Sequence, residues 1–190
     1  MDAVAALRAG EPVLLPTDTV YGLCSAADES PVQRLYALKG RVTGRPTTLL
    51  AASVDALLDC VPELDERLLR SLLPGGYTLL LPNPARRYPW LTGAHPETIG
   101  VRVCVLPAQA RAVVAAVGAV AATSANEPGE PPPASLEEVP LRIRAACAAE
   151  LDAGRLPGTA STVLDLTGPQ PAVVREGAAP SAAALARLKR

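Results

Sequence analysis

The sequence predicts one α/β domain over residues 1–190, with parallel and antiparallel strands in a single sheet that helices flank. Short apolar runs, of which Val13–Leu15 is the first, have the continuous apolar character of strands buried on both faces. Longer amphipathic segments, such as Val32–Lys39, alternate with these runs. The two kinds of segment follow each other in mixed order without a repeat or a linker, which favours one domain.

Composition and charge narrow the class of protein. The chain has 190 residues, of which 49% are hydrophobic, and it lacks phenylalanine, so its core must be built from leucine, valine and alanine. The net charge of −1 gives no general attraction to nucleic acid, and any anion site must be local. No apolar run reaches the roughly 18 residues of a membrane span, and the N-terminus has no secretory pattern. We therefore expect a cytoplasmic protein with no membrane partner.

The cysteines and the histidine do not form a recognisable site. Cys24, Cys60, Cys104 and Cys147 are far apart and contain no C-x-x-C pair, so neither a disulfide framework nor a zinc site is predicted. His95, the only histidine, lies in a polar segment far from Cys24, which argues against a cysteine nucleophile. We expect no metal site built from protein side chains.

The first elements lead to the most informative stretch of the chain. A short helix is expected to end at Gly10, and the buried strand Val13–Leu15 follows it. Pro16 cannot donate to a sheet, so the strand should end there. The polar residues Thr17–Thr19 then open a loop. Their pattern is equally consistent with a capped turn and with a binding loop at a strand end.

The next helix has clear boundaries. Ser30 is placed as its N-cap, Pro31 suits its first position, and Gly40 ends it. A polar loop, Val42–Pro46, carries Arg45 beyond this helix.

The later elements follow from β-prone apolar runs, helical periodicity and Pro/Gly breakers. Ser135 and Glu138 have the spacing of a capping box, and Thr167–Pro169 is typical of a hairpin turn. The expected strands are Thr47–Ala51, Tyr77–Leu81, Thr98–Val105, Ala119–Ala122, Glu150–Gly154, Ser161–Leu166 and Ala172–Arg175. The expected helices are Val54–Cys60, Leu64–Leu72, Ala108–Val117, Ser135 to about Ala149, and Pro180–Arg190, while Asn83–Glu97 is expected to be a long functional or mobile loop.

Polar residues at two strand ends, together with several cations, indicate an anion site. Thr123–Asn126 follows an apolar run, as Thr17–Thr19 does. Arg102 lies among apolar residues and needs a partner or a ligand. Lys39 is one of only two lysines against 16 arginines. With Arg41, Arg45 and Arg175, these residues suit a polyphosphate or a carboxylate. The residues alone predict an anion-binding α/β domain, most simply an enzyme, without a standard phosphate-binding loop.

Six motifs in order make the sequence similar to the YrdC-like family of threonylcarbamoyl-AMP synthases. P-T-D-T-V-Y-G-L at Pro16–Leu23 resembles the most specific signature of that family. The others are K-G-R at Lys39–Arg41, P-G-G-Y-T at Pro74–Thr78, T-I-G-V-R-V at Thr98–Val103, S-A-N at Ser124–Asn126, and S-T-V-L-D at Ser161–Asp165 followed by V-R-E-G. The resemblance implies a twisted mixed sheet around a concave basic cavity, and the chain matches the short form of the family without its extra C-terminal domain.

The resemblance also implies a reaction. L-Threonine, bicarbonate and ATP would give threonylcarbamoyl-AMP and pyrophosphate, with Mg²⁺ bound to the ATP phosphates. A separate complex would then transfer the threonylcarbamoyl group to tRNA.

Roles for individual residues follow from the same resemblance. Thr17, Arg102 and Ser161 are expected to hold threonine, with Arg102 pairing its carboxylate. Lys39 and Asn126 are expected in the phosphate or magnesium region. The residues expected at ATP are Arg41, Arg45, Thr98, Ala122, Ser124 and Arg175, and the catalytic set is Lys39, Arg41, Ser124 and Asn126.

Three positions depart from the family pattern and leave alternatives open. Val42 stands where proline is usual, Leu50 stands where some members have a threonine-contacting histidine, and Pro132 stands near a usual serine. Features of the sister YciO-like branch are also present, so the alternatives are a YciO-like protein without synthase activity and an RNA-binding module. A carbamoyl-adenylate chemistry like that of hydrogenase-maturation proteins is a third. The near-neutral charge and the few aromatic residues disfavour RNA binding.

Overall fold

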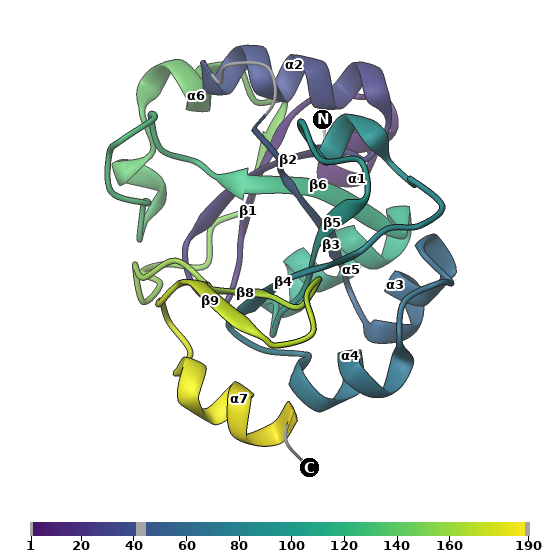
Figure 1. Ribbon diagram of the computed structural model, residues 1–190. Helices are drawn as coiled ribbons and strands as arrows, with labels where there is room; N and C mark the ends of the chain where they lie inside the picture. The colour runs from purple at the N-terminus through teal and green to yellow at the C-terminus, as the bar shows by residue number, and fades with distance from the viewer. Residues whose placement is uncertain (1, 41–44, 189–190) are drawn as a thin grey trace.

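Nine strands form one sheet in the computed structural model, which describes residues 2–40 and 45–188. The sheet is strongly twisted, and helices lie around it (Figure 1). Its order is β7-β1-β2-β6-β3-β5-β4-β8-β9. The strands are β1 (Val13–Pro16), β2 (Tyr21–Ala26), β3 (Thr48–Ala51), β4 (Tyr77–Pro82), β5 (Thr98–Val103), β6 (Ala119–Ser124), β7 (Ala149–Glu150), β8 (Thr162–Asp165) and β9 (Ala172–Arg175).

The pairing of the strands confirms the predicted mixed sheet. β1 with β7, β3 with β5, and β4 with β8 are parallel. The other neighbouring pairs are antiparallel, including β2 with β6 and the terminal hairpin of β8 and β9. In this arrangement the turn after β1 and the end of β6 come to the same end of the sheet, because Gly22 is opposite Ser124.

Helices cover the sheet and the ends of its strands. α2 and α6 lie together at the top of Figure 1, and α4 and α7 lie together at the bottom. The α-helices are α1 (Ala3–Arg8), α2 (Glu29–Lys39), α3 (Val54–Cys60), α4 (Glu66–Leu72), α5 (Ala108–Val117), α6 (Leu141–Ala145) and α7 (Ser181–Leu188), and two short 3₁₀ turns are η1 (Pro89–Leu91) and η2 (Leu136–Glu138).

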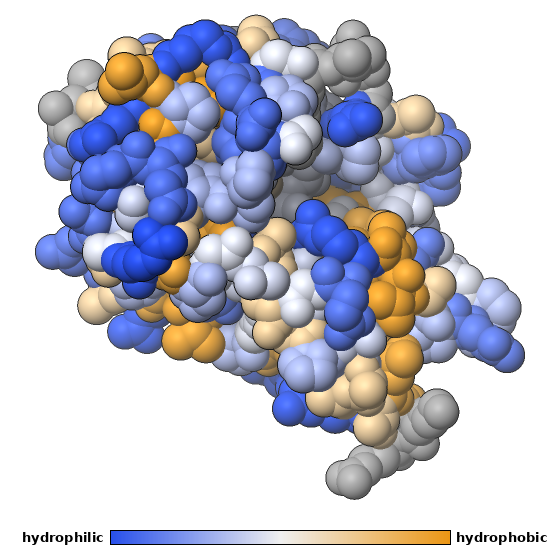
Figure 2. Space-filling model, turned by 90° about the vertical axis from the view of Figure 1, so that its left-hand side faces the viewer, coloured by the Kyte–Doolittle hydropathy of each residue, from blue (hydrophilic) through white to orange (hydrophobic). Residues whose placement is uncertain are grey.

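The central strands are buried on both faces, which explains why their apolar runs have no polar break. Leu49 of β3 packs in one apolar cluster and its neighbour Leu50 in another, on opposite faces of the strand. Leu14 and Leu15 of β1 divide between two clusters in the same way. On the face shown in Figure 2, exposed hydrophobic residues form small groups among hydrophilic ones.

Several predicted boundaries are confirmed, and one strand was missed. α3 and α5 match their predictions residue for residue. β2 lies in the segment that was predicted to be a loop, so the residues after Val20 turn back as a buried strand against β1. β6 likewise continues through Thr123 and Ser124, which were predicted to follow the strand.

Two helix predictions were wrong. α2 begins after Asp28, so Ser30 lies inside the helix and does not cap it. The long helix expected from Ser135 is broken into η2 and α6 at Pro140, which lacks the N–H that an uninterrupted helix needs. The Glu138 carboxylate accepts from the Ala134 N–H at 2.7 Å, one residue before the predicted capping box.

The long segment from Asn83 to Glu97 is held by its own hydrogen bonds. The Asn83 side chain is buried and donates to the carbonyl oxygens of Arg87 and Pro96, each at 2.9 Å. This network and η1 give the segment a defined path. Within residues 2–40 and 45–188, none of the helices has the length and apolar character that crossing a membrane requires.

Candidate functional site

A cavity of about 320 Å³ lies where the polar strand ends meet. It brings together six of the residues predicted from the sequence, which are separated by up to 158 positions along the chain. These are Thr17, Arg102, Ala122, Ser124, Ser161 and Arg175. Among the described residues that line it, the charged ones are Arg102 and Arg175. The cavity therefore combines hydroxyl groups with two guanidinium groups, a chemistry that suits carboxylate and phosphate ligands.

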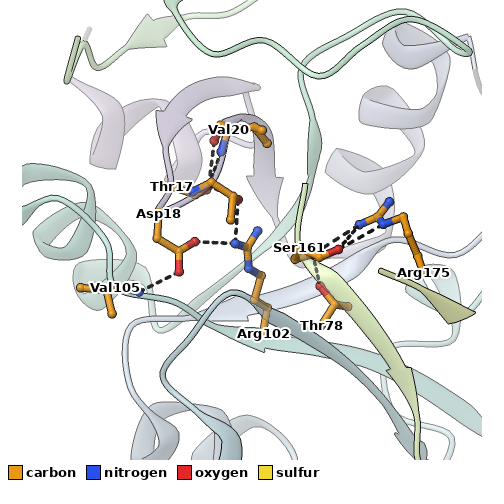
Figure 3. Close-up of polar contacts among 9 residues, drawn as sticks. Thr17, Asp18, Val20, Thr78, Arg102, Val105, Ser161 and Arg175 are labelled. Carbon is orange, nitrogen blue, oxygen red and sulfur yellow. Dashed lines mark hydrogen bonds and ion pairs between the residues drawn. The ribbon is translucent and has the colours of Figure 1, made fainter. Parts of the chain in front are cut away.

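Arg102 has a partner inside the chain. Its Nη2 donates to Asp18 Oδ1 at 2.5 Å and to Thr19 Oγ1 at 2.8 Å. Figure 3 shows the Arg102 side chain rising between the turn that carries Thr17 and Asp18 and the segment that carries Ser161. Arg102 is 8% exposed, and its Nε is buried without a hydrogen-bond partner. Most buried donors in folded proteins have a hydrogen-bond partner, so the unpaired Nε is an unusual feature of the cavity wall.

The Thr17 hydroxyl organises the turn between β1 and β2. It donates to the Val20 carbonyl oxygen at 2.7 Å and accepts from the N–H groups of Thr19 (3.2 Å) and Val20 (3.1 Å). A hydroxyl has one proton to donate and two lone pairs, so these three bonds use that capacity, and the Thr19 hydroxyl lies a further 3.0 Å away. The stretch after β1 therefore agrees with both predictions made for it. It is a turn stabilised by a side chain, and its residues Thr17 and Val20 line the cavity.

Ser161 contacts the side chains of Thr78 and Arg175 on the other wall of the cavity. Its hydroxyl lies 2.7 Å from the Thr78 hydroxyl. Arg175 donates to the Ser161 carbonyl oxygen from Nη2 at 2.7 Å and from Nε at 3.1 Å. Partial burial of the guanidinium, and then the nearby charge of Arg102, lower the pKa of Arg175. An anion bound between the two arginines would stabilise the charged form of both guanidinium groups.

Lys39, Ser124 and Asn126 form a network beside the cavity. The Lys39 ammonium donates to the Ser124 carbonyl oxygen at 2.6 Å, to Asn126 Oδ1 at 2.7 Å and to the Asn126 carbonyl oxygen. The Ser124 hydroxyl also donates to Asn126 Oδ1 at 2.6 Å. Ser124 lines the cavity, so it connects Lys39 and Asn126 to the wall of the site.

Two of the predicted residues lie away from the described cavity lining. Arg45 is exposed, and Thr98 is half-buried at the start of β5; neither is among the described residues that line the cavity. Arg41 lies outside the described residues, as does Val42. Ala122 lines the cavity, and its carbonyl oxygen accepts from the Thr47 hydroxyl at 2.9 Å.

Sequence reasoning assigned no individual role to Asp18, Thr19 or Thr78, although it singled out the loop and the motifs that contain them. The need of Arg102 for a partner was visible in the sequence, but Asp18 is 84 residues away from it, and only the fold selects it. Of the positions that depart from the family pattern, Leu50 lines the cavity and Pro132 does not. Within the part of the chain that the structure describes, no group of three or more His, Cys, Asp or Glu side chains has the arrangement of a metal site.

Comparison with protein-family models gives one match. The model of the Sua5, YciO and YrdC proteins, described as "Telomere recombination", matches residues 5–177. This range contains the whole cavity.

Known relatives resemble the chain in sequence and in fold. A threonylcarbamoyl-AMP synthase of Stenotrophomonas maltophilia is 37% identical over 147 residues, which are 74% of this chain and 78% of that protein. P. abyssi Sua5, in a crystal structure with L-threonine, is 30% identical with a TM-score of 0.78 over 94% of this chain and 54% of that one. E. coli YciO is 29% identical with a TM-score of 0.83 over 95% of this chain and 90% of that one. The chain therefore spans about half of P. abyssi Sua5 and nearly all of YciO.

Proposed function

Because the chain belongs to the Sua5/YciO/YrdC family, we propose that it is a threonylcarbamoyl-AMP synthase. It would convert L-threonine, bicarbonate and ATP into threonylcarbamoyl-AMP and pyrophosphate. The observation that carries this proposal is the buried Arg102, which lines a cavity with hydroxyl groups and a second arginine and whose Nε has no partner within the described chain. Support comes from relatives named as this enzyme and from the L-threonine complex of P. abyssi Sua5.

The proposed chemistry has two bond-forming steps. The amine of threonine combines with bicarbonate, loses water and becomes a carbamate. A carbamate oxygen then attacks the α-phosphorus of ATP, and the bond to the bridging oxygen of the β-phosphate breaks as pyrophosphate leaves. Neither step needs a nucleophile from the protein, so positioning and charge neutralisation are the tasks left for the side chains.

Threonine is assigned to the side of the cavity that contains Arg102. The guanidinium would pair with the threonine carboxylate, since a charge-assisted bond to a buried donor is strong. Ser161 offers a hydroxyl on the facing wall. Thr17 would contribute mainly through the shape of its turn, because its hydroxyl is already bonded to Val20.

ATP is assigned to the side that contains Ser124, Arg175 and the backbone at Ala122. Lys39 and Asn126 would act at the phosphates through the network that joins them to Ser124. Arg41, Arg45 and Thr98 complete the set expected at ATP; a role for Arg45 or Thr98 requires the nucleotide to extend beyond the cavity described above.

Magnesium is expected to arrive with ATP. The oxygens of Ser124 and Asn126 are of the hard type that Mg²⁺ accepts, but the Lys39 ammonium 2.7 Å from Asn126 Oδ1 disfavours a cation held by the protein alone. These residues fit a metal that is bound through the phosphates, where it would offset their negative charge. In the cell, the product would be consumed by a separate complex that modifies tRNA in the cytoplasm.

The test is to incubate the protein with ATP, Mg²⁺, bicarbonate and L-threonine and to measure pyrophosphate. We expect release that requires both threonine and bicarbonate, and we expect Arg41→Ala to reduce turnover strongly in a folded protein. Release that is independent of threonine and bicarbonate, or no release at all, would overturn the proposed function.

A second candidate is a YciO-like protein without synthase activity. The likeness to E. coli YciO over nearly the full length of both chains favours it, together with Leu50 at a cavity-lining position. Under this alternative, nucleotide binding would persist without threonine-dependent pyrophosphate release. A filter-binding measurement with tRNA, performed on the same preparation, distinguishes RNA binding from either outcome.

A further inference from the structure

We propose that Asp18 is a positioning residue, which holds the guanidinium of Arg102 so that its remaining donors face the carboxylate of the amino-acid substrate. The proposal rests on the proposed function and deepens it, because it assigns how the carboxylate site is built. Asp18 and Arg102 are joined at 2.5 Å, and their side chains are 16% and 10% exposed.

The first argument is the division of donors on Arg102. Both partners of Nη2, Asp18 and Thr19, belong to the same turn. A guanidinium has five N–H donors in a rigid plane, so fixing Nη2 fixes the direction of all the others. Nε is buried and has no partner. Buried donors without a partner are rare in folded proteins, so Nε calls for an explanation that the pairing with Asp18 does not itself supply.

The second argument is the rigidity of the turn that carries Asp18. The three bonds of the Thr17 hydroxyl close this turn, and Thr17 is 4% exposed. The second Asp18 oxygen accepts from the Val105 N–H at 3.4 Å, just beyond β5. Asp18 therefore accepts hydrogen bonds both from the Arg102 side chain and from the backbone just after the strand that carries Arg102. These two bonds fix the carboxylate relative to the arginine.

The third argument concerns charge. The Asp18 carboxylate offsets the charge of Arg102, which leaves Arg175 as the other cation among the described residues of the cavity wall. Removing the Asp18 charge would make the cavity more positive while freeing Arg102 to move. A single carboxylate, which depends on geometry, should then bind more weakly. A polyanion such as ATP, which depends more on net charge, should bind as well as before or more tightly.

This opposite response distinguishes positioning from a general structural role, and Asp18→Asn tests it. Calorimetry would give the affinities of L-threonine, L-threoninamide and ATP for the wild-type protein and for the variant. We expect Asp18→Asn to weaken the binding of L-threonine at least 10-fold and to remove the preference for threonine over its amide. The affinity for ATP should not fall. Asp55→Asn is the matched control, because it makes the same change in the exposed ion pair of Asp55 with Arg70, and all three affinities should stay unchanged.

Asp18→Glu keeps the carboxylate and moves it by one methylene, so it should recover part of the threonine affinity. Should Asp18→Asn fail to fold, Asp18→Glu alone carries the test, through a rise in the KM for threonine without a rise in the KM for ATP. Equal losses for threonine and ATP in a folded variant, or an undiminished preference for threonine over its amide, would overturn the positioning role while leaving the proposed function intact. A wild-type protein that does not bind L-threonine would overturn both.

Discussion

The ammonium of Lys39 lies 2.7 Å from Oδ1 of Asn126, so the end of α2 is tied to the segment that leaves β6. Lys39 is 3% exposed and bonds the carbonyl oxygens of Ser124 and Asn126 as well. Two motifs that are 87 residues apart in the sequence thus share one cation. The connection gives Lys39 a structural task in addition to its proposed role at the phosphates.

Replacing Lys39 by methionine should therefore affect both stability and catalysis. The half-buried acceptors of Ser124 and Asn126 would lose the ammonium as a donor, at a cost of about 1–3 kcal/mol in the free energy of unfolding. We expect kcat/KM for ATP to fall more than 10-fold. Urea unfolding and pyrophosphate release would be measured together. If the Lys39→Met variant had the stability and activity of the wild type, Lys39 would have neither the structural role nor the role at the phosphates.

Arg175→Lys tests whether the guanidinium shape is needed at the cavity wall. Lysine keeps the positive charge, but its single ammonium cannot reproduce the two-nitrogen contact with the Ser161 carbonyl oxygen. We expect the KM for ATP to rise about 10-fold, with little change in the melting temperature. Arg155→Lys is a control on an exposed arginine, which pairs with Glu138. A wild-type KM in Arg175→Lys would show that charge alone suffices.

Gly177 allows β9 and the chain after it to approach Ser161. A Cβ at this position would lie 2.7 Å from the Ser161 carbonyl oxygen, the atom that Arg175 binds. Gly177→Ala should therefore displace Ser161 and lower both synthase activity and the melting temperature. Gly168→Ala, in the β8–β9 hairpin, is the control, since its nearest neighbour would be 3.8 Å away. Equal behaviour of the two variants would contradict this interpretation.

Alkaline pH should destabilise the protein through Cys104. Burial raises the pKa of this thiol to about 11, from an ordinary value of 9.0. The unfolded chain therefore loses the thiol proton at lower pH than the folded chain. The contribution of Cys104 to stability is complete below pH 9 and declines as the pH rises towards 11. Unfolding free energies measured from pH 8 to 11 should fall less steeply for Cys104→Ala than for the wild type, and parallel curves would count against the assignment.

Much of the fold could be predicted because its signals are local. The apolar run Val13–Leu15 and the helix Ala108–Val117 were recognisable from residues within a few positions of each other. β2 was missed because the polar turn before it and Gly22 within it gave the segment a loop-like pattern. Its partners, β1 and β6, supply the pairing that makes it a strand.

The candidate site could likewise be predicted only in part from the sequence. The sequence by itself determined which residue types are present at the strand ends, and the order of its motifs indicated the family. Only the tertiary structure decided that Asp18 pairs with Arg102, that Lys39 binds Asn126, and that Thr98 stands outside the cavity. The physical reason is that propensities act over a few residues, whereas an ion pair between distant residues depends on the order and register of the strands that carry them.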